Sequence, residues 1–283
     1  MAVFENLFLV FIAGLITALA TGLGAIPFFF FKDISDRWTV GLWGLASGIM
    51  LSASFFGLLF EGLGLQNLST LFSYSAFMAA VTADQLIGVA VGSVIGGLVV
   101  LAADKVIHGY DFKPREIAEA DFKKLMIILG ILTVHSFPEG VAVGVAFADL
   151  GLEGGVQMLG FTVPLLAIFM TVAIAIHNIP EGVAISIPIR DLGISEWRMV
   201  GAAIFSSLPQ PIGAVLAYYF VTLAREFLPY GFGFAAGAMI LLVVHELIPE
   251  ALERGENLPN GGKKELATGL IIGIISMIPL VIY

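Results

Sequence analysis

The sequence predicts an all-α integral membrane protein in which eight transmembrane helices form one bundle. Three observations support this fold class: the composition, the lengths of the apolar stretches and the distribution of basic residues. Of the 283 residues, 59% are hydrophobic and 12% are charged, whereas soluble domains carry about 25% charged residues. A soluble protein this apolar could not cover its surface with polar groups, so lipid must surround most of the chain.

The apolar stretches define the expected spans. A transmembrane helix needs about 20 predominantly apolar residues. Eight stretches meet this criterion, at about 6–31, 38–62, 85–107, 123–148, 157–188, 199–222, 230–252 and 264–283. The semi-apolar segment between the second and third spans fits an interfacial position. The connections are short, so residues 1–283 are expected to form a single domain.

The basic residues predict the orientation, because cytoplasmic loops of membrane proteins are enriched in lysine and arginine. In the eight-span arrangement, only Arg225 lies on the side that holds both termini. The other twelve basic residues lie in loops of the opposite side: Lys32, Arg37, Lys105, Lys113, Arg115, Lys123, Lys124, Arg190, Arg198, Arg254, Lys263 and Lys264. We therefore expect a multi-pass protein of the inner cell membrane with both termini extracellular or periplasmic.

Two similar motifs place ionisable side chains inside apolar spans. HSFPEGVAV occupies residues 135–143 and HNIPEGVAI occupies residues 177–185. Each has a histidine and a glutamate four residues apart, a spacing that puts both side chains on one face of a helix. Each also has a proline at its fourth position, which removes a backbone hydrogen bond and kinks the helix. Since the connection 149–156 is short, the fourth and fifth spans should be antiparallel neighbours whose motifs meet.

The side chains of the two motifs suit a metal ion. Imidazole nitrogen and carboxylate oxygen are ligands of zinc and of other divalent first-row metals. Ionisable residues inside a membrane are costly, so a functional role is their default interpretation. The motifs thus predict a metal site between kinked helices 4 and 5, formed by His135, Glu139, His177 and Glu181. A buried ion pair or a hydrogen bond between helices is the structural alternative.

The paired HSFPEG and HNIPEG motifs resemble those of the ZIP (Zrt/Irt-like protein) family of divalent-metal transporters. SGIMLSASFFGLLFEGL in the second span and GFAAGAMILLVVHELIPEAL in the seventh are similar too. The resemblance extends from the first span to the eighth and is closest to the prokaryotic, GufA-like branch. It implies a single eight-span transporter domain that moves a divalent metal ion into the cytoplasm, and Zn²⁺ is the expected ion.

The resemblance also implies roles for particular residues. Met50 matches a methionine that some family members add to the primary site of two histidines and two glutamates. A second, adjacent position would use Ser136, Asn178 and Gln210, with Glu181 shared between the two. Asparagine is common in place of Ser136 and glutamate in place of Gln210. Neither residue present here brings charge, so we expect one strong site and a weak or absent second one.

Two residues of the seventh span match a family position toward the cytoplasm. His245 and Glu246 are expected along a metal exit path, with structural pairing as the alternative. The motif HELIPE begins like the HExxH motif of zinc proteases, but Pro249 stands where the second histidine would be. We therefore expect no enzyme activity, while an intramembrane metal-dependent hydrolase, a metal sensor and a channel remain the alternative functions for the same site.

The expected substrate is zinc, and no organic cofactor is implied. The ligand set does not rank Zn²⁺ against Cd²⁺, Fe²⁺, Mn²⁺ or Co²⁺. The absence of cysteine excludes disulfides and thiolate metal ligands. A net charge of −9 gives no basis for binding nucleic acid. The expected partners are thus divalent metal ions and membrane lipid. A homodimer is compatible with the sequence, which does not fix the oligomeric state.

Overall fold

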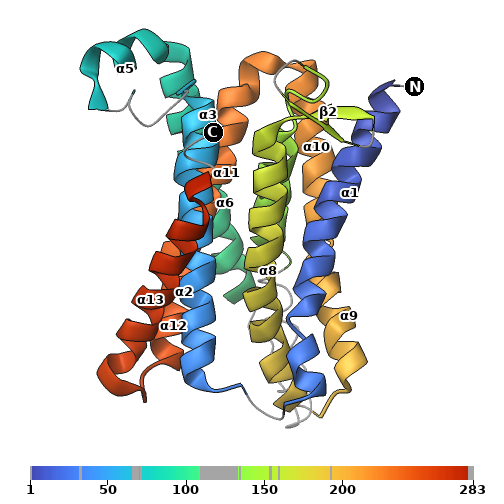
Figure 1. The fold of residues 1–283 in the computed structure, drawn as a ribbon, viewed down its shortest axis with the longest axis vertical. Coiled ribbons are helices and arrows are strands. Elements are labelled where there is room, and N and C mark those ends of the chain that lie inside the picture. Colours follow the sequence, from blue (N-terminus) through green and yellow to red (C-terminus); the bar gives the residue numbers. More distant parts are fainter. Residues whose placement is uncertain are drawn as a thin grey trace.

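The computed structural model describes residues 2–31, 34–65, 70, 72–108, 133, 135–152, 155–158, 160–191 and 193–279. In this part of the chain, long helices run along one axis and form a bundle (Figure 1). Six helical stretches are long and apolar enough to cross a membrane: Val3–Phe29, Asp36–Gly62, Ala83–Val106, Leu165–Arg190, Glu196–Leu223 and Arg225–Arg254. They correspond to all the predicted spans except the fourth and the eighth.

The fourth and eighth predicted spans are described in part. Residues 135–146 are helical, and the predicted beginning of the fourth span, 123–132, lies outside the described residues. The eighth span contains α13 (Lys263–Ser276), a helix of 14 residues, and its predicted end at 280–283 also lies outside them. The described residues therefore support a helical membrane protein with six to eight spans, and the count of eight stays a prediction.

The first, second, third and fifth spans are built from α1 (Ala2–Leu23) with η1 (Ile26–Phe29), α2 (Asp36–Ser52) with η2 (Ala53–Leu59) and α3 (Phe60–Gly62), α6 (Ala83–His108), and α8 (Leu165–Asp191). The η1 turn is a 3-10 helix and η2 is π-helical. The short α5 (Tyr74–Ala80) lies off the side of the bundle at one end, within the segment expected at the interface (Figure 1).

The sixth to eighth spans are α9 (Glu196–Ser206) with α10 (Pro209–Leu223), then η3 (Arg225–Phe227), α11 (Leu228–Leu242), η4 (Val243–Leu247) and α12 (Ile248–Arg254), and finally η5 (Pro259–Gly262) with α13. Pro209 begins a new helix in the sixth span, because proline fits the first turn and lacks the N–H that a helix interior needs. The η4 segment is π-helical, a geometry that is frequent at functional sites.

The fifth span begins later than the sequence predicts. The prediction of 157–188 was wrong at its start, since α8 begins at Leu165. The preceding residues form a hairpin in which β1 (Val156–Met158) pairs antiparallel with β2 (Phe161–Val163). Gly160 turns the chain with a φ of +83°, a conformation that glycine adopts without steric cost. Apolar content alone did not distinguish this hairpin from a helix.

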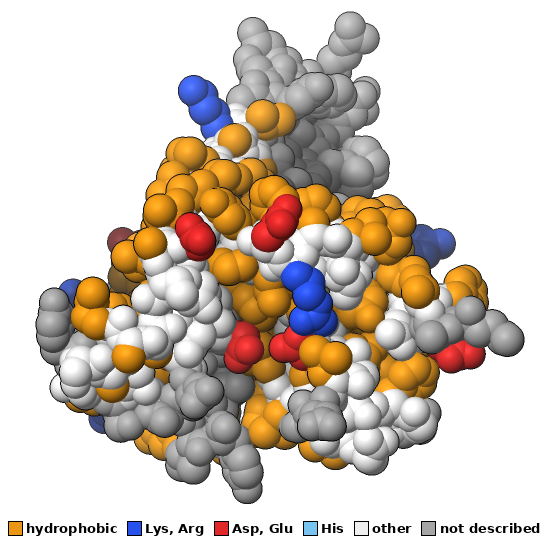
Figure 2. Space-filling model, turned by 90° about the horizontal axis from the view of Figure 1, so that it is seen from above, with side chains coloured by type: hydrophobic (Ala, Val, Ile, Leu, Met, Phe, Trp, Pro, Cys, Tyr) orange, Lys and Arg blue, Asp and Glu red, His pale blue; other side chains and the backbone are white. Residues whose placement is uncertain are grey.

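The described charged side chains mark the two ends of the bundle. At the end where α2 and α13 begin, Arg37 pairs with Glu265 at 3.4 Å. At the opposite end, which holds the hairpin, Arg225 pairs with Asp149 at 3.0 Å. Figure 2 looks onto the hairpin end and shows acidic side chains around a basic one near the centre of a largely hydrophobic surface. We call the first end, which holds Arg37, Arg254, Lys263 and Lys264, the basic end.

Close helix contacts depend on glycine. At Gly48 of α2, an ideal Cβ would lie only 2.2 Å from the carbonyl oxygen of Leu270 on α13. Real Cβ atoms do not approach backbone oxygen so closely, so any side chain there would push the two helices apart. Glycine in this way lets two helix backbones touch, as is usual inside membranes.

The variant Gly48→Ala is expected to lower the melting temperature of the purified protein in detergent, since overpacking a tight contact costs about 1–3 kcal/mol. Gly41→Ala is the matched control, because Gly41 lies in the same helix and an ideal Cβ there meets no atom within 4 Å. We expect the control to melt at or slightly above the wild-type temperature. Equal melting temperatures for the two variants would contradict the contact between α2 and α13.

Candidate metal centre

Three side chains of the paired motifs meet inside the bundle. Glu139 comes from the helix 135–146, and His177 and Glu181 come from α8. One ligand atom of each lies within 4.8 Å of the other two. All three side chains are buried, and His177 Nε2 is 3.2 Å from Glu139 Oε1. We call these three residues the ligand cluster.

The local structure of α8 explains how one helix supplies two members. His177 and Glu181 are one turn apart, so their side chains share a face. The helix continues through Pro180, which lies between them. Proline removes one backbone hydrogen bond from the helix interior, but it leaves the spacing of the two side chains intact.

Several polar atoms of the ligand cluster have no hydrogen-bond partner among the described residues. These atoms are His177 Nδ1 and both carboxylate oxygens of Glu181. A buried carboxylate without a partner is very unfavourable, and a cation in the cluster would remove this cost. The donor set of one imidazole and two carboxylates fits a divalent metal ion such as zinc.

His135 lies apart from the ligand cluster. Its Nε2 is 3.0 Å from Glu246 Oε1, and the imidazole is buried. The structure thus pairs a predicted ligand of the primary site with a residue predicted for the exit path. The spacing of residues in the sequence gives no signal for this pair, because the partners are more than a hundred positions apart.

A cavity of about 630 Å³ connects the ligand cluster with the basic end. Its walls include the three cluster residues together with His135 and, farther along, Asp36 and Arg254. Arg254 and Asp36 form an ion pair of 2.8 Å. Since Arg254 is exposed and the ligand cluster is buried, the cavity extends from this end of the bundle to the ligands.

Three glutamates of η4 and α12 line this cavity: Glu246, Glu250 and Glu253. Their spacing of four and three residues puts them on one helix face, and this pattern in HELIPEALE was a signal that the sequence analysis missed. His245, in contrast, is exposed and is not among the described residues that line the cavity. Neighbouring residues on a helix point in different directions, which explains the difference.

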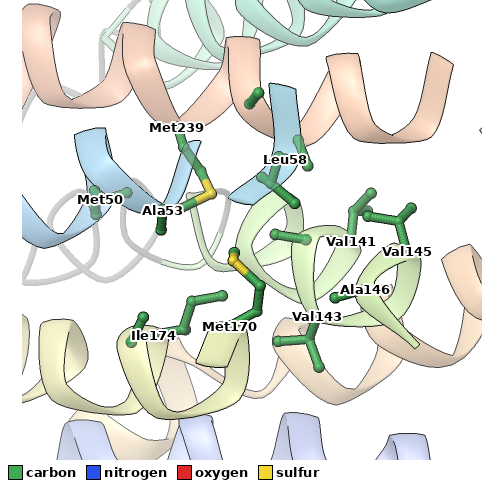
Figure 3. Close-up of a cluster of buried hydrophobic side chains, with 14 of the residues drawn as sticks. Met50, Ala53, Leu58, Val141, Val143, Val145, Ala146, Met170, Ile174 and Met239 are labelled. Carbon is green, nitrogen blue, oxygen red and sulfur yellow. The ribbon is translucent and has the colours of Figure 1, made fainter. Parts of the chain in front are cut away.

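Hydrophobic side chains fill the space between the ligand cluster and the hairpin end. Figure 3 shows Met170 and Ile174, which precede His177 on α8, packed with Met239 of α11. Met50 lies in the same hydrophobic group, buried beside Ala53. It is not among the described residues that line the cavity, and its role as a metal ligand stays a prediction.

The residues predicted for a second metal position are all fully buried: Ser136, Asn178 and Gln210. Gln210 Nε2 donates to Glu139 Oε2 at 2.5 Å. Asn178 Nδ2 donates to Gln210 Oε1 at 3.0 Å and to the carbonyl oxygen of Thr17 at 2.7 Å. The structure therefore connects two of these residues to the ligand cluster through hydrogen bonds.

Comparison with known proteins identifies relatives of this chain. A family model described as ZIP Zinc transporter matches residues 115–280, which include both motifs. Zinc transporter GufA of Myxococcus xanthus is 30% identical over 93% of this chain and 94% of its own length. Zinc transporter ZIPB of Bordetella bronchiseptica is 31% identical over 91% of this chain and 75% of its own length.

A relative in Arabidopsis thaliana, whose name also refers to zinc transport, is 35% identical over 92% of this chain. The chain spans 36% of the length of that plant protein, and 94% of the length of the bacterial GufA. The residues that match the family model include the ligand cluster. The chain belongs to the ZIP zinc transporter family.

Proposed function

We propose that the protein carries Zn²⁺ across the inner cell membrane into the cytoplasm, with the ligand cluster as its binding site. One observation carries the proposal: two carboxylates and an imidazole are buried together at the inner end of a cavity that is open at the basic end. Membership of a family of zinc transporters supports transport over catalysis. The names of the bacterial relatives support zinc as the substrate.

The basic residues support the direction of transport. If the basic end faces the cytoplasm, as the enrichment of lysine and arginine in cytoplasmic loops predicts, the cavity opens to the cytoplasm. The buried hydrophobic side chains that precede His177 on α8, Met170 and Ile174, then lie between the ligand cluster and the outside. We propose eight spans with both termini outside, and the structure then represents a state that releases zinc inward. A homodimer stays a prediction.

When zinc binds to the ligand cluster, His135 would join the three residues of the cluster as a further ligand. Zinc commonly takes four nitrogen or oxygen ligands, and His135 would be the fourth after it leaves Glu246. Each ligand must be deprotonated before it binds the ion, so binding releases protons from any protonated ligand. On release, His135 would return to Glu246, and the ion would pass Glu250 and Glu253 on its way out. The same ligands also suit Cd²⁺, Fe²⁺, Mn²⁺ and Co²⁺.

Uptake into liposomes that contain a zinc-sensitive dye tests the proposed function. The purified protein is expected to give saturable zinc uptake, and Glu181→Gln is expected to reduce it at least about tenfold, because it removes a charged ligand. Glu196→Gln, an exposed change at the start of α9, is the control and should transport normally.

Three outcomes of this assay would count against the proposal. The absence of zinc uptake by the wild-type protein would contradict transport. Normal uptake by Glu181→Gln would exclude the ligand cluster as the binding site. Uptake that rises linearly with zinc concentration, without saturation, would indicate that the protein is a channel and not a carrier.

The pairing of His135 with Glu246 predicts a separate kinetic effect. Glu246→Gln weakens the interaction that would draw His135 away from the bound metal and so slows release of the ion. The maximal uptake rate should therefore fall severalfold, while KM stays constant or falls. Uptake rates measured over a range of zinc concentrations check this prediction. A higher KM with an unchanged maximal rate would contradict the exchange and would mean that Glu246 only attracts the ion.

A further inference from the structure

We infer that Gln210 is a positioning residue that holds Glu139 and takes the place of a second metal ion, so that the site binds one ion. This inference rests on the proposed function, because it assumes that Glu139 is a zinc ligand. It concerns the number of ions at the site and can be tested by binding, without transport.

The hydrogen bonds around Gln210 fix the orientation of its amide. Its Oε1 accepts a hydrogen bond from Asn178 Nδ2 at 3.0 Å, and its Nε2 lies 2.5 Å from Glu139 Oε2. The nitrogen of Asn178 is fixed in turn, because it also donates to the carbonyl oxygen of Thr17 at 2.7 Å. Gln210 therefore presents an N–H donor to the carboxylate. An amide nitrogen of this kind donates and does not bind a cation.

The backbone around Gln210 leaves its amide little room to withdraw. Gln210 lies in the first turn of α10 and is fully buried. An ideal Cβ at Gly140 would lie 2.2 Å from the carbonyl oxygen of Gln210, so the start of α10 packs directly against the residue that follows Glu139. The amide and the carboxylate are thus held together by the contact between two helices.

Charge balance also favours a single ion. The ligand cluster contains two carboxylates, Glu139 and Glu181, whose combined charge one divalent ion neutralises. A second divalent ion would leave two uncompensated positive charges in a buried site, which is very unfavourable. The Gln210 amide satisfies Glu139 Oε2 without adding charge. Glu139 Oε1 faces His177 Nε2 at 3.2 Å, so an ion held between these two atoms would bind both residues.

The change Gln210→Glu should admit a second ion. It replaces the donor by a third carboxylate directly beside Glu139, and two adjacent carboxylates repel unless a cation lies between them. Asn178 Oδ1, which is buried without a hydrogen-bond partner among the described residues, offers a further oxygen ligand. With a second zinc, the variant site would carry one uncompensated positive charge in place of two, and it would offer additional oxygen ligands for that ion.

Zinc stoichiometry tests this inference. Zinc is titrated into the purified full-length protein by calorimetry, and bound zinc is measured by mass spectrometry after gel filtration. Each protein is compared with the same protein that also carries Glu181→Gln. The difference in bound zinc gives the number of ions at the site and leaves out ions bound in the acidic cavity. We expect one site ion for the wild type, two for Gln210→Glu and one for the control Gln157→Glu, an exposed change in the hairpin.

The variant Gln210→Met adds a test of positioning. It keeps the length of the side chain but removes the donor, so we expect one site ion bound about 10–100-fold more weakly, as is usual when a partner of a metal ligand is lost. Two site ions in the wild type would overturn the inference. One site ion in a folded Gln210→Glu, or unchanged affinity in Gln210→Met, would also overturn it.

The outcomes separate this inference from the proposed function. One site ion without uptake into liposomes would refute zinc transport and leave the role of Gln210 intact. Should Gln210→Glu not fold, the wild-type stoichiometry and the affinity of Gln210→Met still decide the question.

Discussion

The burial of two carboxylates beside an imidazole is the constraint on which the rest of the structure depends. Glu139 and Glu181 lie in the interior of an apolar bundle, where an uncompensated charge is very unfavourable. A divalent cation would compensate both charges and would bind the oxygens of Glu181, which lack partners among the described residues. A bound cation would therefore stabilise this site, as expected for the binding site of a cation carrier.

The surroundings of the site differ on its two sides. An acidic cavity leads to the basic end. Between the hairpin and His177, α8 instead contributes Met170 and Ile174 to a cluster of buried methionine and aliphatic side chains (Figure 3). Water that enters the cavity would screen charges and stabilise a departing ion, and the apolar group would oppose the passage of an ion in the other direction. Helix contacts formed through glycine, such as that of Gly48 with Leu270, hold the bundle around both regions.

The sequence predicted much of the site because the relevant signals are local. The spacing of four residues between His177 and Glu181 places both on one helix face, and the repeat of this pattern indicated that Glu139 would join them. The predicted start of the fifth span was wrong, because hydropathy does not distinguish the hairpin 156–163 from a helix. A glycine with positive φ, Gly160, decides between the two.

Contacts between distant segments could not be predicted. The pair of His135 with Glu246 and the hydrogen bond from Gln210 to Glu139 join helices that are far apart in sequence. Residue type showed that Gln210 brings no charge. Only the structure shows that its nitrogen faces the carboxylate, since the partners of the amide determine which way it points.

The central claim is that zinc binds to the histidines and glutamates of the paired motifs. X-ray absorption spectroscopy of the zinc-loaded protein tests it most directly, because the spectrum reports the atoms bound to the metal. We predict nitrogen and oxygen neighbours at about 2.0–2.2 Å, including two imidazoles, with one imidazole lost in His177→Ala. A spectrum without imidazole neighbours, or one that His177→Ala leaves unchanged, would contradict the account.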